Sequence, residues 1–356
     1  MTETKEIIYT KKHIMTTFTV FPNIKANNKG NSNPYIKDFI AAINNTPDCK
    51  VINPSHKNPL LSIITPKKWG DIIIFNWYES IPDFKHGYIQ FFIAYILLIC
   101  MKISKKKIIW VLHNKKPHAE KKELLKKILT SHIANLSDHI ITHAEEGLEI
   151  IEKKFPSCRN KAHFIDHPTK NRMYLTKSDK EIVKKYDLLI WGSISKYKGV
   201  YDFIKYLNDN KINDLKVCVL GKCNSELLVN DIKSVSTPNT TLVLKSASFE
   251  ELAEYISFSD FVLMPYKHDT ILSSGTLMDT LSFGAKVIGP DTGSFSDYSK
   301  NNDLNVYVFN KFDDIKDIVK KHHDTKISEE GYSKFLEENN WNAFIRKAIS
   351  LITSHQ

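Results

Sequence analysis

Short apolar runs alternate with amphipathic segments along the chain, and this alternation predicts strands separated by helices. In the first half, the predicted strands are Phe18–Phe21, Asp71–Phe75, Lys107–Leu112 and His139–Thr142. The predicted helices that follow them are Tyr35–Asn44, Tyr88–Ile103, Lys121–Leu136 and Glu145–Lys154. This order is typical of βαβ units, whose strands form a parallel sheet.

The same rhythm begins again in the second half. Its predicted strands are Asp187–Trp191, Lys216–Leu220, Thr240–Leu244, Phe261–Met264 and Lys286–Ile288. Its predicted helices are Gly199–Asn208, Glu226–Lys233, Phe249–Ser257 and Thr276–Phe283. The polar segment His167–Asp179 has no clear period and predicts a linker.

We therefore predict an α/β protein with two doubly wound, Rossmann-like domains that face each other across a cleft. The predicted domains are residues 1–170 and 171–340. Residues 341–356 form an amphipathic C-terminal helix that can lie across either domain, including a return to the first. Ligands of such sheets bind at the carboxyl ends of the strands, so we expect the site in the cleft.

Composition is that of an ordinary globular protein with an excess of lysine. The 356 residues carry a net charge of +10, with only three arginines: Arg159, Arg172 and Arg346. The excess is either solvated surface charge or an attraction to an anionic partner, such as a membrane surface or a phosphorylated substrate. Zinc-finger spacing, RNP-like strands and base-reading basic helices are missing from the sequence, so we expect no nucleic-acid partner.

The compartment is predicted from the cysteines and the N-terminus. The five cysteines are scattered without CxxC spacing, and the N-terminus lacks the apolar core of a signal peptide, which favours the cytoplasm. The apolar segment Tyr88–Ile103, followed by Lys105–Lys107, is shorter than the roughly 20 residues that span a bilayer. It is either a helix packed against the sheet or one with a face in the inner leaflet of the plasma membrane.

Polar loops follow two predicted strands of the first half. An Asn-rich loop ends with Asn33 and Tyr35 and either approaches phosphate or sugar hydroxyl groups or is a surface loop. His113 directly ends another strand and is followed by Asn114 and His118. A histidine here points into the cleft, where it can bond a substrate hydroxyl or neutralise developing charge. The alternative is a histidine satisfied in the core.

A third loop combines aromatic and acidic side chains. Asn76, Trp77 and Glu79 follow the strand Asp71–Phe75. Aromatic faces stack on sugar rings, and Glu79 is a candidate acid or base. The alternative is that Trp77 belongs to the core and Glu79 caps a helix.

In the second half, the turn Ser273-Ser274-Gly275 precedes a helix that begins near Thr276. Backbone N–H groups and hydroxyls at such a helix start favour an anion. Gly192 lets the chain turn closely after a strand, and Lys198 precedes the next helix, where a phosphate would sit. The GxxxxGK[ST] and GxGxxG spacings are both missing. Three further strand-end residues either line the same pocket and contact the nucleoside or are ordinary strand ends: Gly221, Lys222 and Lys245.

Together these loops resemble those of the GT-B glycosyltransferases. Among these enzymes, they are most similar to the group like glycosyltransferase family 4, which builds bacterial polysaccharides and lipid-linked glycans. Residues 192–199 resemble that family's G-x-x-x-x-x-K-G loop. Residues 264–290 resemble its segment with a Ser/Gly turn and an E-A-x-x-x-G-x-P-V ending. Residues 76–79 and 110–118 resemble the H-W-P-E and W-T-x-H-N-x-x-P-H segments of exopolysaccharide transferases.

The resemblance implies transfer of a sugar from a UDP- or GDP-sugar to a glycan or lipid-diphosphate acceptor, without a metal. Lys198, residues 273–276 and the helix dipole would stabilise the leaving diphosphate. His113 would act at the donor sugar, and Glu79 is the candidate base if the configuration inverts. The basic first half, from Lys115 to Lys127, can face the acceptor or anionic lipid.

The sequence departs from the family at its pair of glutamates. Their positions carry Ile271, where the sugar-binding glutamate is expected, and Asp279, where the ribose-binding one is expected. The arginine that accompanies the loop lysine is replaced by Ser193 or Ser195. Two other functions therefore stay open: a catalytically inactive protein that binds sugar nucleotides, and a nucleotide-sugar epimerase or hydrolase.

Overall fold

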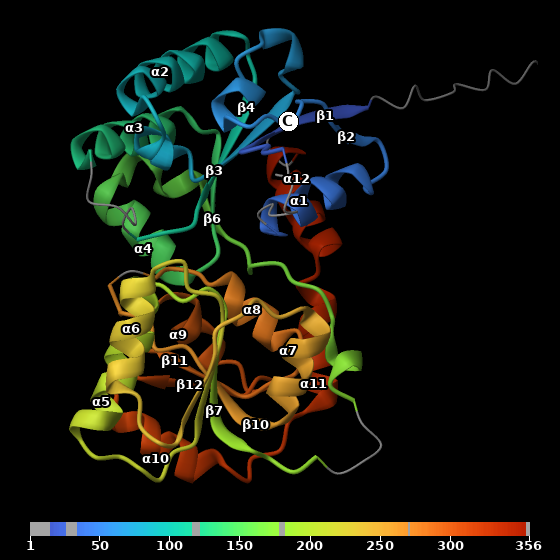
Figure 1. The fold of residues 1–356 in the computed structure, drawn as a ribbon. Coiled ribbons are helices and arrows are strands. Elements are labelled where there is room, and N and C mark those ends of the chain that lie inside the picture. Colours follow the sequence, from blue (N-terminus) through green and yellow to red (C-terminus); the bar gives the residue numbers. More distant parts are fainter. Residues whose placement is uncertain (1–14, 26–33, 116–121, 178–181, 270, 354–356) are drawn as a thin grey trace, which may run out of the picture.

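Two parallel six-stranded sheets, one in each half of the chain, form the structure (Figure 1). It is a computed structural model that describes residues 15–25, 34–115, 122–177, 182–269 and 271–353. The first sheet contains β1 (Thr16–Phe21), β2 (Cys49–Val51), β3 (Ile72–Asn76), β4 (Lys107–Leu112), β5 (His139–Thr142) and β6 (Ala162–Phe164). The second contains β7 (Tyr186–Trp191), β8 (Val217–Leu220), β9 (Thr240–Val243), β10 (Ser259–Leu263), β11 (Val287–Pro290) and β12 (Val306–Phe309). The predicted α/β fold with two parallel sheets is confirmed.

Helices cover both sheets. In the first half they are α1 (Pro34–Asn44), α2 (Gly87–Ile103), α3 (Glu123–Leu136) and α4 (Glu145–Lys154). In the second half they are α5 (Val200–Asp209), α6 (Glu226–Val235), α7 (Phe249–Ser257), α8 (Gly275–Leu281), α9 (Gly293–Ser299), α10 (Asp313–His322), α11 (Glu329–Glu338) and α12 (Trp341–Thr353). The alternation did not predict β2, β6 or β12.

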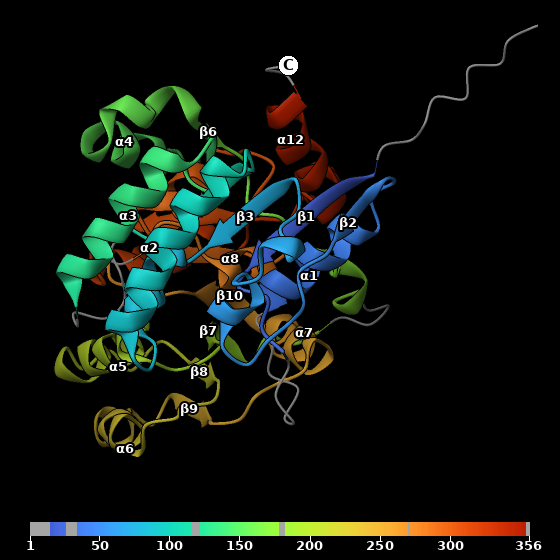
Figure 2. The same cartoon turned by 90° about the horizontal axis from the view of Figure 1, so that it is seen from above.

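The first sheet is buried on both faces, as its nearly continuous apolar strands require. Five of the six residues of β4 are buried. One core, which includes Trp110 and Leu129, lies between the sheet and the helices α2, α3 and α4. The other, which includes Ile109 and Phe39, lies under α1 and α12. Figure 2 shows these two groups of helices on opposite sides of the sheet.

The end of the chain returns to the first sheet. Trp341 and Phe344 of α12 contact Phe39 of α1, with ring centroids 5.9 and 5.4 Å apart. The linker between the two sheets runs beside this returning segment, because the N–H of Thr169 donates to the carbonyl of Asn339 at 3.0 Å. Two segments of the chain, the linker and the segment before α12, therefore run side by side between the halves (Figure 1).

Strand order places the ligand-binding edge of each sheet. The order is β2-β1-β3-β4-β5-β6 in the first sheet and β12-β11-β10-β7-β8-β9 in the second. The winding direction reverses between β1 and β3 and between β7 and β10, and such reversals open a crevice at the carboxyl ends of the strands. The loops after these strands are therefore where a ligand is expected.

Candidate functional site

Two loops of the second sheet meet at its reversal point. The loop after β7 turns at Gly192, whose φ of 103° lies in the left-handed region that favours glycine. It continues through a short 3-10 helix, Lys196–Lys198. At Gly199 a side chain would lie 1.8 Å from the carbonyl oxygen of Pro265, which follows β10. Because Gly199 has no side chain, the backbone beside Lys198 can pack directly against the loop after β10.

Lys198 is a buried ammonium without a carboxylate partner among the described residues. Its side chain is 8% exposed, and the one hydrogen bond found for its Nζ there is a long contact of 3.4 Å with Thr276 Oγ1. The two other buried lysines are paired: Lys126 Nζ lies 2.5 Å from Asp83, and Lys286 Nζ lies 3.0 Å from Asp260. A buried unpaired charge is costly, so this position calls for an anion from outside the chain.

The Ser-Ser-Gly turn begins α8 opposite Lys198. The Ser274 hydroxyl caps this helix by accepting the N–H of Leu277 at 3.2 Å. The helix is fixed to β7 because Trp191 Nε1 donates to Thr280 Oγ1 at 2.8 Å. A side chain at Gly192 would lie 3.0 Å from Lys198 Nζ, so the glycine keeps the ammonium free to face α8.

A cavity of about 230 Å³ opens between the two sheets, and we call it the cleft cavity. From the second sheet it is lined by Lys198, Ile271 and the turn with Ser273, Ser274, Gly275 and Thr276. From the first half and the linker it is lined by Tyr35, Trp77, His113, Asn114 and His167. The fold thus brings together nine of the residues that the sequence singled out for the site.

His113 is held as a neutral imidazole at the mouth of β4. Asn76 donates its amide to the carbonyl of Phe21 at 3.1 Å, which turns the Asn76 oxygen toward His113 Nε2 at 2.9 Å. The Nε2 atom therefore carries the proton, and Nδ1 keeps a lone pair. Burial first, then the nearby His143 and His167, holds the pKa of His113 well below its ordinary value.

Aromatic rings fix the plane of His113. Trp77 stacks on it with ring centroids 4.2 Å apart, and the Tyr35 ring meets it edge-on at 5.1 Å. The Tyr35 hydroxyl lies 3.0 Å from Nε2 of His143. The N-terminal wall of the cleft is thus an apolar, aromatic surface with polar atoms at its edges, the kind of surface that receives a sugar ring.

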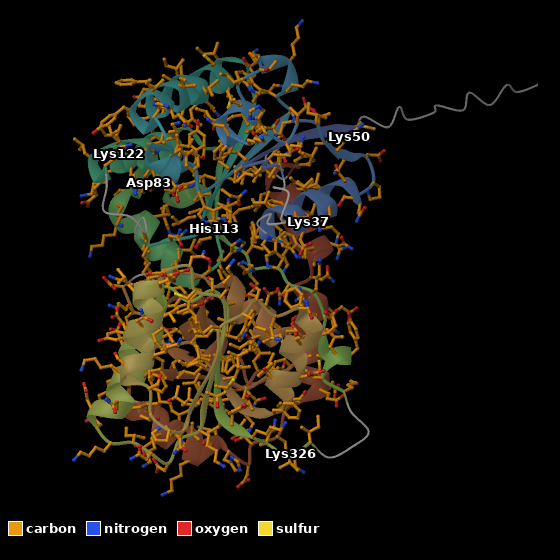
Figure 3. The ribbon with its side chains drawn as sticks, in the orientation of Figure 1. Lys37, Lys50, Asp83, His113, Lys122 and Lys326 are labelled. Atoms are coloured by element: carbon orange, nitrogen blue, oxygen red, sulfur yellow. The ribbon has the colours of Figure 1, made fainter. Side chains whose placement is uncertain are left out.

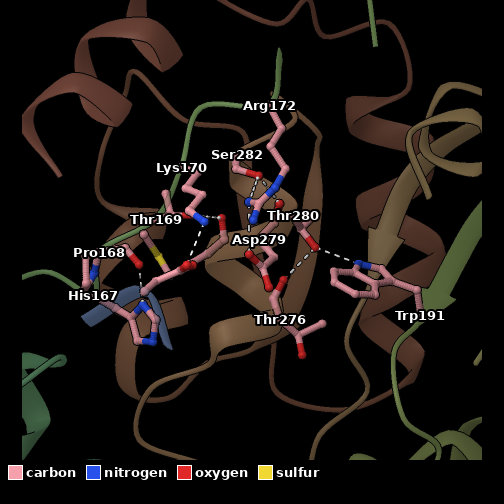
Figure 4. Close-up of polar contacts among 12 residues, drawn as sticks. His167, Pro168, Thr169, Lys170, Arg172, Trp191, Thr276, Asp279, Thr280 and Ser282 are labelled. Atoms are coloured by element: carbon pink, nitrogen blue, oxygen red, sulfur yellow. Dashed lines mark hydrogen bonds and ion pairs between the residues drawn. The ribbon is translucent and has the colours of Figure 1, made fainter. Parts of the chain in front are cut away.

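A second cavity of about 470 Å³ adjoins the first, and we call it the linker cavity. Tyr35, His167, Gly275 and Thr276 line both cavities. Asp279 lies in the linker cavity, where Arg172 Nη1 contacts its carboxylate at 3.1 Å (Figure 4). Burial raises the pKa of Asp279 to about 6, against the opposing effect of Arg172.

Arg172 is a residue that the sequence did not single out. Its Nη1 also donates to Ser282 Oγ at 2.9 Å, and its guanidinium lies over the Phe249 ring at 3.9 Å. A linker arginine carries no local motif, since its partners come from α7 and α8, more than 70 residues later. Arginine is rare in this chain, with three in all, and this rarity was the one available sign that Arg172 belongs to a site.

The remaining predicted residues lie elsewhere. Gly221 and Lys222 follow β8, and Lys245 pairs with Glu251 at 2.8 Å on the surface. None of these three lines either cavity, which argues against their predicted contact with a nucleoside. Asn33 and His118 lie outside the described residues.

Glu79 requires a correction. It belongs to a short 3-10 helix, Tyr78–Asp83, and does not line the cleft cavity. Its carboxylate is buried, Oε2 has no hydrogen-bond partner in the described part of the chain, and Lys126 of α3 is a nearby charge. The backbone turns at Trp77, with φ 51°, so that Trp77 lines the cleft cavity, whereas Glu79 lies near Lys126 of α3. This position argues against the predicted role as a general base.

Glu79→Gln tests this correction. Burial raises the pKa of Glu79 from 4.5 to about 7, so the folded state holds the proton more tightly than the unfolded chain. Its contribution to stability is therefore lost as the pH rises from about 4.5 to about 7. We expect the free energy of unfolding of Glu79→Gln, measured in denaturant, to exceed that of the wild type by on the order of 2–3 kcal/mol at pH 8. At pH 4 the two should differ little. Turnover of the variant should be unchanged, and a loss above 100-fold would restore the role as a base.

The two halves contact each other beside the cleft cavity. Glu146, at the start of α4, accepts the N–H of Gly293 at 2.9 Å, and Lys115 lies 2.5 Å from the same carboxylate. Lys115 also donates to the hydroxyl of Thr292. Figure 3 shows His113 at the boundary between the halves. The domains are therefore in a closed contact, with the two walls of the site facing each other.

Comparisons with known proteins agree with this architecture. No family model matches the sequence, and no curated protein matches it. HepE of Anabaena in complex with UDP-glucose has a TM-score of 0.66 and 10% identity, over 94% of this chain and 99% of that one. The lipopolysaccharide outer core galactosyltransferase WaaB has a TM-score of 0.59 and 12% identity, over 96% and 99%. A mutant of S. aureus TarM, in a complex that includes UDP, reaches 0.59 and 12%, over 83% and 59%. The chain therefore has the two-domain GT-B fold, as the resemblance predicted.

Proposed function

We propose that the protein is a glycosyltransferase that moves a sugar from a nucleoside diphosphate sugar to a glycan or lipid-linked acceptor in the synthesis of a cell-surface polysaccharide. One observation carries the proposal: the buried ammonium of Lys198 has no carboxylate partner among the described residues and lines a cavity between two nucleotide-type sheets. A diphosphate is the anion that such a position fits, because the turn at Ser274 adds hydroxyl and amide donors.

The chemistry follows from the positions of the charges. Departure of the nucleoside diphosphate leaves negative charge on the bridging oxygen, and Lys198 and the residue 273–276 turn stabilise it where it develops. The aromatic wall excludes water from the sugar. The lone pair on His113 Nδ1 accepts a hydrogen bond from a sugar hydroxyl. This bond orients the sugar so that its anomeric carbon faces the acceptor.

The linker cavity suits the nucleoside. Asp279 presents a carboxylate oriented by Arg172, and a carboxylate is a good acceptor for the paired hydroxyls of a ribose. The shared lining residues place this cavity next to the diphosphate position. HepE holds UDP-glucose in a related fold, which supports a UDP-sugar as the first donor to test.

A catalytically inactive sugar-nucleotide binder is the second candidate. Ile271 lines the cleft cavity at the position where the resemblance places a sugar-binding glutamate. An aliphatic side chain there cannot bond a sugar hydroxyl, so the protein either uses another group or does not turn over.

Thermal unfolding with UDP, GDP, ADP and CMP tests the shared premise of nucleotide binding. A nucleotide at 100 times its Kd adds about 2.7 kcal/mol to stability. Incubation with UDP-glucose and with GDP-mannose, each with and without a glycan acceptor, then separates the candidates. Turnover that needs an acceptor supports the transferase. Turnover of donor alone indicates an epimerase or hydrolase, and binding without turnover indicates the inactive protein.

We also propose that the N-terminal domain docks on an anionic membrane through α2. Six large apolar side chains of this helix are 38–76% exposed: Tyr88, Ile89, Phe92, Ile96, Ile99 and Ile103. At 100° per residue they fall within a stripe about 100° wide. The opposite face, with Leu98 and Met101, is buried in the core. Figure 1 shows α2 on the outer side of the N-terminal domain, away from the second sheet.

Lysines around the stripe indicate lipid rather than a protein partner. Exposed Lys85 precedes α2, Lys105 follows it, and Lys127 lies on the neighbouring α3. Ammonium groups at the rim of an apolar stripe suit a bilayer with anionic headgroups. Within the described residues, no helix is both long and apolar enough to cross a membrane.

Phe92→Asp and Ile96→Asp are expected to weaken sedimentation with phosphatidylglycerol vesicles, each by about tenfold, because each removes an apolar group worth about 1.5–3 kcal/mol on burial. Both side chains are exposed, so stability should not fall. Leu227→Asp, on α6 and 78% exposed, is the matched control and should sediment like the wild type. Self-association that these variants abolish, without any vesicle binding, would instead make the stripe an interface between copies.

A further inference from the structure

His167 lies in the linker between the halves, with its ring at the junction of the two cavities. It is 7% exposed, and the described contacts assign it no carboxylate partner. No motif in the sequence marked it. Figure 4 shows the imidazole beside Pro168, at the edge of the group formed by Arg172 and Asp279.

Hydrogen bonding fixes which nitrogen of His167 carries the proton. Nδ1 lies 2.9 Å from the carbonyl oxygen of Pro168, and a carbonyl only accepts, so Nδ1 donates. The neutral ring therefore keeps a lone pair on Nε2. In the described part of the chain Nε2 has no hydrogen-bond partner, and it lies 3.9 Å from the position that a Cβ would take at Gly275. No other described heavy atom outside this turn and helix lies within 4 Å of that position.

The neighbouring histidines are engaged differently. Nδ1 of His143 lies 2.8 Å from the carbonyl of Ile165, and its Nε2 lies 3.0 Å from the Tyr35 hydroxyl. Both nitrogens of His143 are thus satisfied in the neutral state. The Nε2–H group of His113 donates a hydrogen bond to the side-chain oxygen of Asn76. Among these three rings, His167 is the one whose unprotonated nitrogen lies within 4 Å of the position that a Cβ would take at Gly275.

The charge of the proposed ligand exceeds what the cleft cavity offers. A nucleoside diphosphate sugar carries two negative charges, and Lys198 supplies one positive charge. The linker arginine, Arg172, is already paired with Asp279. A lone pair on His167 Nε2 would repel a phosphate oxygen at the turn, whereas a proton on the same atom would donate to it.

We propose that His167 is a donor-binding residue that takes up a proton on Nε2 when the diphosphate binds and so supplies the second positive charge of the site. The inference rests on the proposed function, because it needs a diphosphate in the cleft cavity. His167 would then take the place of the arginine that the resemblance expects beside Lys198. Because a histidine can gain and lose its charge near neutral pH, donor affinity would depend on pH.

The direction of the pH dependence follows from burial. Burial lowers the pKa of His167 to about 4, so the ring is neutral in the empty protein at neutral pH. A bound diphosphate raises this pKa, so binding takes up protons and affinity rises as the pH falls. Titratable and charged groups surround His167 in the linker, on α1, after β4 and β5, in the 3-10 helix Lys196–Lys198, and on α8 and α9. They are Asp166, Lys170, Arg172, Tyr35, Lys37, Asp38, His113, His143, Lys198, Asp279 and Tyr298.

Calorimetry with UDP-glucose tests the proposal, because the charge of this diphosphate diester is constant near neutral pH. Binding heats are measured at pH 6.5 in two buffers with different protonation enthalpies, which gives the number of protons taken up. We expect uptake by the wild type and by Lys198→Ala, whose affinity is lower. We expect no uptake by His167→Gln, a roughly tenfold lower affinity, and loss of the dependence on pH between 6 and 8.

Each outcome decides a different point. Binding without proton uptake in the wild type, or equal uptake in His167→Gln, overturns the role of His167 and leaves the proposed function intact. If neither UDP-glucose nor GDP-mannose binds, the proposed function fails and this inference fails with it. Should His167→Gln not fold, nitrogen-labelled histidine in the wild type gives the answer, since the His167 Nε2 resonance must move to the protonated range on binding.

Discussion

Lys198→Ala is expected to bind nucleoside diphosphates roughly 10- to 150-fold more weakly, because it removes a charged hydrogen bond of about 1.5–3 kcal/mol. The same change should not destabilise the empty protein. Lys198 is buried, and no carboxylate pairs with it among the described residues, so the alanine variant no longer has to bury an unpaired charge. Loss of binding without loss of stability is the signature of a residue that serves a ligand.

Two lysines provide matched controls for this prediction. Lys196 lies two residues earlier in the same turn and is exposed, so Lys196→Ala should leave affinity and stability unchanged. Lys126 is buried and paired with Asp83, so Lys126→Ala should cost about 3 kcal/mol of stability. Denaturant unfolding and calorimetry with UDP measure both quantities. Undiminished affinity in Lys198→Ala would remove this lysine from the site and with it the main support for the proposed function.

His113→Ala is expected to reduce turnover by about 100-fold or more while nucleotide affinity changes little. The neutral ring is held by Asn76 and Trp77, and His113 lines the cleft cavity. Its loss leaves the sugar free to leave the reactive geometry, and misplacement by about 1 Å costs about that factor. The nucleotide contacts, which we assign to Lys198 and the linker cavity, stay in place.

Separate measurements of kcat and UDP affinity distinguish this role from a structural one. His132 of α3, stacked on Tyr95, is a histidine that lines neither cavity. His132→Ala should therefore keep wild-type turnover. Equal losses of affinity and turnover in His113→Ala would place His113 at the nucleotide instead of the transferred sugar.

Most strands and helices of the fold could be predicted from local sequence. The predicted bounds of β4, β5, α4 and α7 agree with the structure at both ends, because each has a clear period and a clear boundary. The helix after the Ser-Ser-Gly turn is shorter than predicted and ends at Leu281. The helices α10 and α11 were not predicted, because each has only three apolar residues among ten.

The candidate site was predictable wherever chemistry and strand ends coincide. His113 and Trp77 follow strands directly, and Lys198 ends the loop after β7, just before α5. Parallel strands bring their carboxyl ends to one edge, so sequence alone places these residues in the cleft. Glu79 stands three residues beyond a strand, and its side chain is directed by a turn whose backbone angle the sequence does not reveal.

The sequence by itself determined that this chain forms two parallel sheets and that lysine, histidine and serine residues stand at their ligand-binding edges, because periodicity and strand ends are local properties. Tertiary structure alone decided which charges have partners. Lys126 and Lys198 look alike in the sequence, yet one is neutralised by Asp83 and the other is not neutralised by any described carboxylate. Arg172 and His167 likewise acquire their roles only where the linker packs against α8, since burial and pairing depend on residues far apart in the chain.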